Sequence, residues 1–204
     1  MIRDKSFFLR DDVVAISRDL IGMILYTKMN GVVTAGRIVE TEAYGGVTDR
    51  ASHAWDGRLT DRTKIMYREG GLCYIYLCYG IHHLFNIVTG PEGRPDAVLI
   101  RALEPVTGIE TMLERRGLDM VQRRVAGGPG LVSQALGLKT DQNGLSLINS
   151  KKIWLERGVA DGKIPVGDID IIASPRVGVD YAGEDAARPW RFRLKGNKFT
   201  SPAK

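Results

Sequence analysis

Cysteine is scarce in this sequence, which holds two such residues among 204, Cys73 and Cys78. Both lie in the apolar run "LCYIYLCYG", and five positions separate them. If that run is one strand, the two side chains are about 16 Å apart and on opposite faces of it. A disulfide needs Cα atoms within about 7 Å, so the pattern predicts two free thiols, which suit a reducing cytosol.

Histidine is also rare, with His53, His82 and His83 as the three examples. His82 and His83 are adjacent, and adjacent residues of a strand point to opposite faces, so they form a poor chelating pair. The sequence has no Cys-x-x-Cys or His-Glu-x-x-His spacing, no P-loop, and no recognisable serine or cysteine nucleophile motif. It therefore predicts no metal site.

Long apolar runs are absent as well. The first thirty residues interleave charged and apolar groups, so we expect no signal peptide, and no stretch reaches the roughly 18 apolar residues of a membrane span. The sequence does have a surplus of basic residues, with a net charge of +5 and a pI near 9.3. That balance is compatible with an anionic partner.

Apolar patterns and turn signals predict an α+β fold, a single domain over residues 1–204 with a mostly antiparallel sheet and surrounding helices. Asn30-Gly31 is a strong signal for a two-residue hairpin turn inside residues 23–44. Further strands are expected over residues 72–80, 82–90, 96–105, 168–173 and 190–196.

Helices are expected within residues 11–22, 104–117 and 127–138. Cap-type aspartates open the first, Thr107 and Glu110 have capping-box spacing in the second, and Pro129 suits the first turn of the third. Residues 45–71 are polar and lack clear periodicity, which is typical of a functional loop. The polar residues 196–204 are expected to fray.

The stretch "RIVETEAYGG" ends the second strand of the expected hairpin. Glu40, Glu42 and Tyr44 occupy alternate positions there, so they should project from the same face. Paired carboxylates can serve as acid and base, or as nucleophile and acid, of a glycoside hydrolase. The same pattern is also typical of a solvated strand face, and this stretch alone leaves both interpretations open.

Basic residues cluster in three places beside aromatic ones. The clusters are Arg58, Arg62, Lys64 and Arg68; Arg115, Arg116, Arg123 and Arg124; and Arg191, Arg193 and Lys195. The last three alternate with Trp190, Phe192 and Leu194, which predicts a strand with one cationic and one apolar face. Any one cluster could be a solvated surface, but three of them favour a phosphate backbone as ligand. Tyr79, a bulky ring before Gly80 at a tight turn, could enter a base stack as a wedge.

Four motifs in order carry a resemblance to a known family. These are "IVETEAY", "SHA" with His53 nine residues after Tyr44, "YIYLCYG" followed by Asn86, and "VLIRALEP". With the later "WLERG" and "RVGVDYAGEDAARPWRF", the chain resembles the alkyladenine (3-methyladenine) DNA glycosylase family from about Val13 to Lys195.

The resemblance implies a curved antiparallel sheet with surrounding helices and an activity in DNA repair. A monofunctional enzyme of this kind flips alkylated or deaminated purines out of double-stranded DNA and hydrolyses the N-glycosidic bond, leaving an abasic site. The resemblance further implies that the protein has no cofactor and acts as a monomer away from membranes. Because we expect no secretion signal, we also expect it to work in the cytoplasm, at the bacterial nucleoid, or in the nucleus.

The resemblance also implies roles for individual residues. Glu42 matches the general base that activates a water, and Arg101 matches the arginine that helps to hold that water. Tyr44 matches the ring on one side of the everted base, and His53 with Tyr76 match the other side. Glu40 is expected to be structural.

Other positions match residues that contact DNA or select the base. Asn86 matches the side chain that crowds the exocyclic amino group of guanine, and Tyr79 matches the side chain that fills the gap in the duplex. The remaining DNA-contacting positions are Arg58, Thr60, Arg62, Ile81 and His82. The chain departs from the family pattern at Ile81, where methionine is frequent, and at Asp61 and Thr63, where proline and asparagine are frequent.

Two other functions are compatible with the same residues. A non-catalytic nucleic-acid-binding module would show salt-dependent binding without base release. A carbohydrate-directed glycoside hydrolase would use Glu40 and Glu42 as its two carboxyl groups. Intact Glu42 and Arg101 oppose the first, and the basic surface opposes the second.

Overall fold

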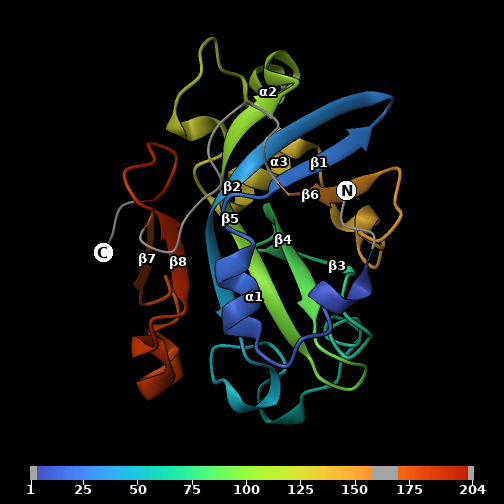
Figure 1. Ribbon diagram of the computed structural model, residues 1–204, viewed down its shortest axis with the longest axis vertical. Helices are drawn as coiled ribbons and strands as arrows, with labels where there is room; N and C mark the ends of the chain where they lie inside the picture. The colour runs from blue at the N-terminus through green and yellow to red at the C-terminus, as the bar shows by residue number, and fades with distance from the viewer. Residues whose placement is uncertain (1–3, 158–169, 202–204) are drawn as a thin grey trace.

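The computed structural model describes residues 4–157 and 170–201, which form a twisted sheet flanked by short helices (Figure 1). The strands are β1 (Ile24–Met29), β2 (Val32–Tyr44), β3 (Cys73–Cys78), β4 (His82–Thr89), β5 (Asp96–Thr107), β6 (Ile153–Glu156), β7 (Ile171–Ser174) and β8 (Arg191–Leu194). The helices are α1 (Val13–Asp19), α2 (Ile109–Arg116) and α3 (Pro129–Leu136), together with short 3-10 turns.

The sheet has the order β3-β4-β5-β2-β1-β6, with β8 beside β2 and β7 beside β8. Every strand pairing in the described parts of the chain is antiparallel. The predicted α+β class is therefore confirmed. The expected strand over residues 168–173 is present as β7, although residues 168 and 169 lie outside the described residues.

The predicted turn between β1 and β2 is confirmed. Asn30 and Gly31 have φ values of 51° and 82°, and Met29 pairs with Val32 across the turn. Positive φ at both central residues gives a turn whose twist matches that of the flanking strands. The free thiols are confirmed too, because Cys73 is buried, Cys78 is half-buried, and neither forms a disulfide.

The helix predictions are confirmed for α1, α2 and α3. The Asp12 carboxylate accepts hydrogen bonds from the backbone N–H groups of Val14 and Ala15, which caps α1. Pro129 occupies the first turn of α3. None of the described helices has the length and apolar character needed to cross a membrane.

The capping box predicted for α2 is wrong. Strand β5 continues through Thr107, so the cap falls on Gly108, whose φ is 67°. A Cβ atom at Gly108 would lie 2.4 Å from the carbonyl oxygen of Val33, so only glycine fits this close approach.

The C-terminal segment is not frayed through residues 196–201, which corrects a second expectation. The Phe199 ring is buried in a small apolar cluster with Val39 and Ala102. The backbone N–H of Ser201 donates to Glu40 Oε2 at 2.7 Å. The polar composition of this segment does not predict these two contacts, because one is made by a single ring and the other depends on a residue far away in sequence.

A double irregularity interrupts the pairing of β2 with β5 in the middle of the sheet. Ile38 pairs with Leu103, Glu40 with Ala102, and Thr41 with Ile100. Val39 and Arg101 are therefore the extra residues of two bulges, one in each strand. Bulges re-aim side chains and are frequent beside active sites.

Strand β2 separates the core from a polar layer. The Thr41 hydroxyl contacts Ser17 of α1, with 3.0 Å between the two side-chain oxygens. Because neighbouring strand residues alternate, Glu40 and Glu42 project from the other face. The connection between β2 and β3, residues 45–72, gathers at the lower end of the molecule in Figure 1.

Candidate active site

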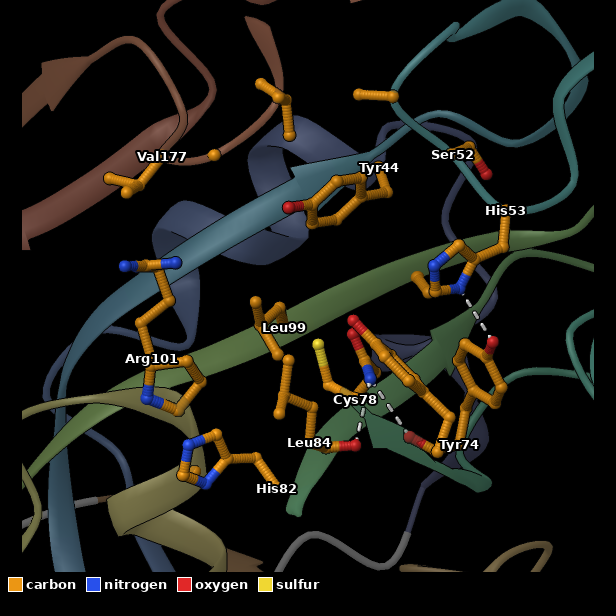
Figure 2. Close-up of a pocket in the computed structure, with 18 of the residues that line it drawn as sticks. Tyr44, Ser52, His53, Tyr74, Cys78, His82, Leu84, Leu99, Arg101 and Val177 are labelled. Atoms are coloured by element: carbon orange, nitrogen blue, oxygen red, sulfur yellow. Dashed lines mark hydrogen bonds between the residues drawn. The ribbon is translucent and has the colours of Figure 1, made fainter. Parts of the chain in front are cut away.

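A cavity of about 610 Å³ opens on the polar side of β2 and β5 (Figure 2). Besides residues of these two strands, four segments line it: the loop after β2, the β3–β4 hairpin, the start of α3, and residues 177–181. Figure 2 shows Tyr44 and Arg101 on one side of this space, with His53 and Tyr74 on the other. The loop predicted to be functional therefore contributes to this cavity.

Glu42 lies directly behind this cavity wall and is fully buried. Its Oε2 accepts hydrogen bonds from the Tyr44 hydroxyl at 2.8 Å and from Arg101 Nη1 at 3.3 Å. Its Oε1 accepts from the backbone N–H of Val177 at 2.8 Å. A carboxylate offers about four acceptor positions, so these three donors leave room for another, at Oε1.

The interpretation of a solvated strand face is wrong, because Glu40 and Glu42 both have 0% exposure. The shared face predicted for Glu40, Glu42 and Tyr44 is confirmed by their contacts, since Arg101 bonds both carboxylates and Tyr44 bonds Glu42. Burial first, and then the Glu42 charge, raise the pKa of Tyr44 well above its usual value. Tyr44 therefore stays protonated and donates to the carboxylate.

The aromatic wall across the cavity consists of His53, Tyr74 and Tyr76. The His53 ring packs edge-on against Tyr76 with centroids 4.6 Å apart, and the rings of Tyr74 and Tyr76 are 5.4 Å apart. His53 Nδ1 lies 2.8 Å from the Tyr74 hydroxyl. Tyr74 is 2% exposed, so it is a core residue that also supports the site.

Arg62 fixes the protonation state of His53. Arg62 Nη2 donates to His53 Nε2 at 3.0 Å, and its guanidinium carbon lies 4.4 Å from the centroid of the Tyr76 ring. Because an arginine only donates, Nε2 must be the acceptor, so Nδ1 carries the proton and donates to Tyr74. Burial, Arg62 and Arg58 lower the pKa of His53 to about 4.

This lowered pKa predicts a stability that falls with acid. Between about pH 6.5 and 4 the unfolded chain binds a proton at His53 that the folded chain excludes, so stability is lost as pH falls through this window. On going from pH 7 to pH 5, the wild type should lose about 1–2 kcal/mol more unfolding free energy than His53→Gln. Urea unfolding at both pH values measures this, and equal losses would contradict it.

Asn86 is held rigidly in the cavity wall. Its side-chain N–H groups donate to the carbonyl oxygens of Tyr74 and Leu84, at 3.1 and 3.3 Å. The residue is 4% exposed. A side chain anchored by two bonds resists displacement, so it can exclude a group of the wrong shape.

Tyr79 stands at the tip of the β3–β4 turn and is 91% exposed. Its φ of 50° and that of Gly80, 72°, are both positive, and Ile81 N–H closes the turn on the Cys78 carbonyl at 3.1 Å. Positive φ is strained for a bulky residue that buries nothing. Ile81 follows at 71% exposure, and the His82 side chain packs over Gly130 of α3.

The predicted basic surface is only partly present. Arg58 and Arg62 are exposed beside the cavity, and Thr60, also exposed, braces the loop through hydrogen bonds with Thr63. Arg115 and Arg116 instead bond to backbone carbonyls between α2 and its neighbours.

The alternating strand "WRFRLK" does not present one cationic face to solvent, which is a correction. Arg191 is 1% exposed, and its Nε lies 2.8 Å from Glu40 Oε1. Strand β8 pairs with β2, so it turns this arginine onto a buried carboxylate rather than to solvent. The pairing partner of β8 could not be deduced from its alternation alone.

Sequence reasoning missed Arg176, Val177 and Tyr181 as members of the site. The Arg176 guanidinium lies 4.9 Å from the centroid of the Tyr44 ring, and its side chain is fully buried. Tyr181 lines the cavity rim, and its hydroxyl donates to the Ala51 carbonyl at 3.3 Å. The segment "RVGVDYAG" contains all three and was the available signal. In the described residues, no cluster of three or more His, Cys, Asp or Glu side chains could hold a metal ion.

Comparison with known proteins identifies the class. The family model of the methylpurine-DNA glycosylases matches residues 6–198. A Natranaerobius thermophilus protein named "Putative 3-methyladenine DNA glycosylase" is 41% identical over 199 residues, which cover 97% of this chain and 98% of the relative. A protein of that name from Chlamydia pneumoniae is 44% identical, over 93% of this chain and 93% of the relative. One from Bacillus cereus is 40% identical, over 95% of this chain and 96% of the relative.

The class is therefore that of the DNA glycosylases of DNA repair. Within that class, the chain belongs to the methylpurine-DNA glycosylase family, which confirms the resemblance drawn from the sequence.

Proposed function

We propose that this chain, acting as a monomer of one domain, everts alkylated or deaminated purines from double-stranded DNA and hydrolyses their N-glycosidic bond. One observation carries the proposal. A buried carboxylate, Glu42, is bonded to Arg101 and Tyr44 at the wall of a cavity whose other wall is aromatic. A cavity of about 610 Å³ is in the usual size range of small-molecule sites, so it can enclose a base.

Eversion is required because the sugar carbon that reacts is shielded inside a stacked duplex. Rotating a nucleotide out costs about a few kcal/mol, and a damaged or mismatched base costs least. The exposed ring of Tyr79, presented at the tip of a hairpin beside the cavity, suits the role of a wedge that fills the gap. Arg62 and His82 line the cavity, and Ile81 follows in the same turn at 71% exposure. With Arg58 and Thr60 from the exposed loop after β2, they would contact the DNA.

The chemistry we assign to Glu42 is that of a general base. Water attacks C1′ of the deoxyribose, the bond from C1′ to the purine nitrogen breaks, and the base leaves with the electron pair. Glu42 takes the proton of the water and stabilises the positive charge that develops on the sugar. A cationic alkylpurine leaves as a neutral base, and the product DNA carries an abasic site.

The walls would select the base by stacking and by shape. Tyr44 on one side and His53 with Tyr76 on the other offer electron-rich ring faces, which attract cationic alkylpurines. His53 is neutral at physiological pH, so it adds no competing charge. The anchored Asn86 side chain would crowd the exocyclic amino group of guanine and so protect the normal base.

The other two functions fit these contacts less well. A carbohydrate-directed hydrolase needs a second free carboxyl group, but Glu40 is bonded to Arg101, Arg191 and Ser201 and faces no open space. DNA binding without catalysis does not require a carboxylate like Glu42, which is buried beside the cavity and has one hydrogen-bond acceptor position unused. It nevertheless makes a clear prediction, which is DNA binding without base release.

Base release from defined duplexes tests the proposal. Duplexes with a single ethenoadenine or hypoxanthine, and methylated DNA, are incubated with the enzyme at fixed salt, and free base and abasic sites are quantified. We expect release from at least one damaged duplex and none from undamaged DNA. Salt-dependent binding without release from any lesion would favour the binding module instead.

Replacing Tyr79 tests its role in base release and its effect on stability separately. Asn tolerates positive φ, and Tyr79 buries almost nothing, so Tyr79→Asn should raise the unfolding free energy by up to about 1 kcal/mol. The same variant should release base about tenfold more slowly, because the everted state loses its wedge. Urea unfolding and single-turnover assays measure the two effects.

A matched control is Val32→Ala, which trims an exposed apolar side chain on the β1–β2 hairpin, outside the cavity lining. It should leave the rate of base release unchanged. A Tyr79→Asn enzyme that releases base at the wild-type rate would remove Tyr79 from the proposed role.

A further inference from the structure

Glu40 accepts more hydrogen bonds than a residue that only fills space in the interior would need. It has 0% exposure, and its Oε1 accepts from Arg101 Nε at 2.9 Å and from Arg191 Nε at 2.8 Å. The Ser201 backbone N–H donates to Oε2 at 2.7 Å, and the Ser201 hydroxyl lies 2.7 Å from Oε1. Burial tends to raise the pKa of Glu40, but Arg101, Ser201 and Arg191 outweigh it and lower the pKa, so the residue is ionised.

Arg101 is shared between this carboxylate and the proposed base. Its Nε donates to Glu40 and its Nη1 to Glu42, with the second contact longer, at 3.3 Å. A guanidinium is planar and rigid, so fixing the direction of Nε–H also fixes the direction of Nη1. Arg101 is the extra residue of a bulge and is 8% exposed, and its side chain donates hydrogen bonds to Glu40 and Glu42.

We propose that Glu40 is a positioning residue for base release: it holds Arg101 in place and takes up part of its charge, so that Glu42 remains able to accept a proton. This inference rests on the proposed function. Without Glu40, the whole charge of Arg101 would fall on Glu42, and a carboxylate that is so strongly paired is a weaker base.

The other charged and titratable groups around Glu42 have partners of their own, so Glu40 is the group that shares the charge of Arg101 with Glu42. Tyr44 stays protonated and donates to Glu42. Arg176, whose charge also acts on Glu42, is paired with Asp49 and lies 4.9 Å from the centroid of the Tyr44 ring. Arg191, from β8, bonds Glu40 and not Glu42. Glu40 is therefore the group through which the positive charge of Arg101 and Arg191 is balanced.

Glu40→Gln tests the inference through a pH profile. The amide keeps the size of the side chain but removes its negative charge, so the ionised form of Glu42 becomes easier to keep and its basicity falls. Single-turnover base release should fall about tenfold, and the acid limb of the profile should move to lower pH by about one unit. DNA affinity should stay within twofold. Glu40→Asp, which keeps the charge, should restore the position of the acid limb.

Arg191→Met provides a second variant in case Glu40→Gln fails to fold. It leaves Glu40 paired with Arg101 and Ser201, so no buried carboxylate loses all its partners. Removing this cation should move the acid limb the other way, to higher pH. Thr27→Val is the control for lost stability alone, because it removes the buried hydrogen bonds of Thr27 to Thr34 and to the Leu136 carbonyl, away from the cavity.

The outcomes separate this inference from the proposed function. If wild type releases no base, or Glu42→Gln is fully active, the proposed function fails. Suppose that those two results are as expected, but the acid limbs of Glu40→Gln and Arg191→Met lie at the same pH as that of Thr27→Val. Glu40 is then only structural, and the inference is overturned. Shifts in opposite directions for the two variants support it.

Discussion

Glu42→Gln should release damaged bases about 10²–10⁴-fold more slowly than the wild type, while binding the same duplexes with similar affinity. Glutamine has nearly the same shape as glutamate, and its carbonyl oxygen can still accept from the Val177 N–H or from the Tyr44 hydroxyl. It has no basic oxygen with which to take a proton from water. The loss should therefore fall on the chemical step and not on recognition.

Single-turnover rates on an ethenoadenine or hypoxanthine duplex, with binding measured separately at fixed salt, isolate that step. The matched control is Glu69→Gln, the same chemical change at a surface glutamate whose ion pair with Lys5 is half-exposed. The control should match wild type in both measurements. Equal rates for Glu42→Gln and wild type would show that another group activates the water.

The positions of Glu42 and Tyr44 could be predicted because they depend only on neighbouring residues in the sequence. The Asn30-Gly31 turn fixes where β2 begins, and alternation along β2 then puts Glu42 and Tyr44 on one face. Their hydrogen bond confirms this juxtaposition. The Tyr79-Gly80 turn is likewise encoded in two adjacent residues, and the structure has both at positive φ.

The bulges at Val39 and Arg101 could not be predicted in this way. Alternation assigns a face only while pairing is regular, and two bulges in opposite strands restore the register without leaving a sign in the apolar pattern. The family resemblance connects Arg101 with Glu42, but the bond of Arg101 to Glu40 appears only in the structure.

Contacts between distant segments account for the other differences. Arg191 and Ser201 reach Glu40 across 151 and 161 positions of the chain, so neither composition nor periodicity can reveal them. A polar tail and a strand of alternating arginines are usually solvated, and here a single buried carboxylate reverses both expectations. Buried charges of this kind are stable only when paired.

Asp49→Ala should cause the largest loss of stability, about 3–5 kcal/mol, because it leaves a buried cation without its counter-ion. Arg176 and Asp49 form a two-pronged ion pair with both side chains fully buried, and Arg176 Nη2 lies 2.8 Å from Asp49 Oδ1. Asp49 also accepts from the backbone N–H groups of Gly45 and Ala51, so it anchors both ends of the turn that follows β2.

The ion pair also supports the site, since Arg176 packs against the rings of Tyr44 and Trp190, 4.9 and 5.2 Å from their centroids. Asp49→Ala should therefore weaken base release even at temperatures where the variant is fully folded. Asp49→Ala/Arg176→Met, which removes the stranded cation as well, should recover part of the lost unfolding free energy.

Asp61→Ala is the matched control for this stability measurement, because it makes the same substitution in the same loop. Asp61 pairs with Lys64 at 2.9 Å, but its side chain is 100% exposed, so the change should leave the urea midpoint unaltered. If Asp49→Ala unfolds at the same urea concentration as Asp61→Ala, water must reach Arg176 in solution. The Tyr44 ring would then lack the rigid support that stacking on an everted base requires.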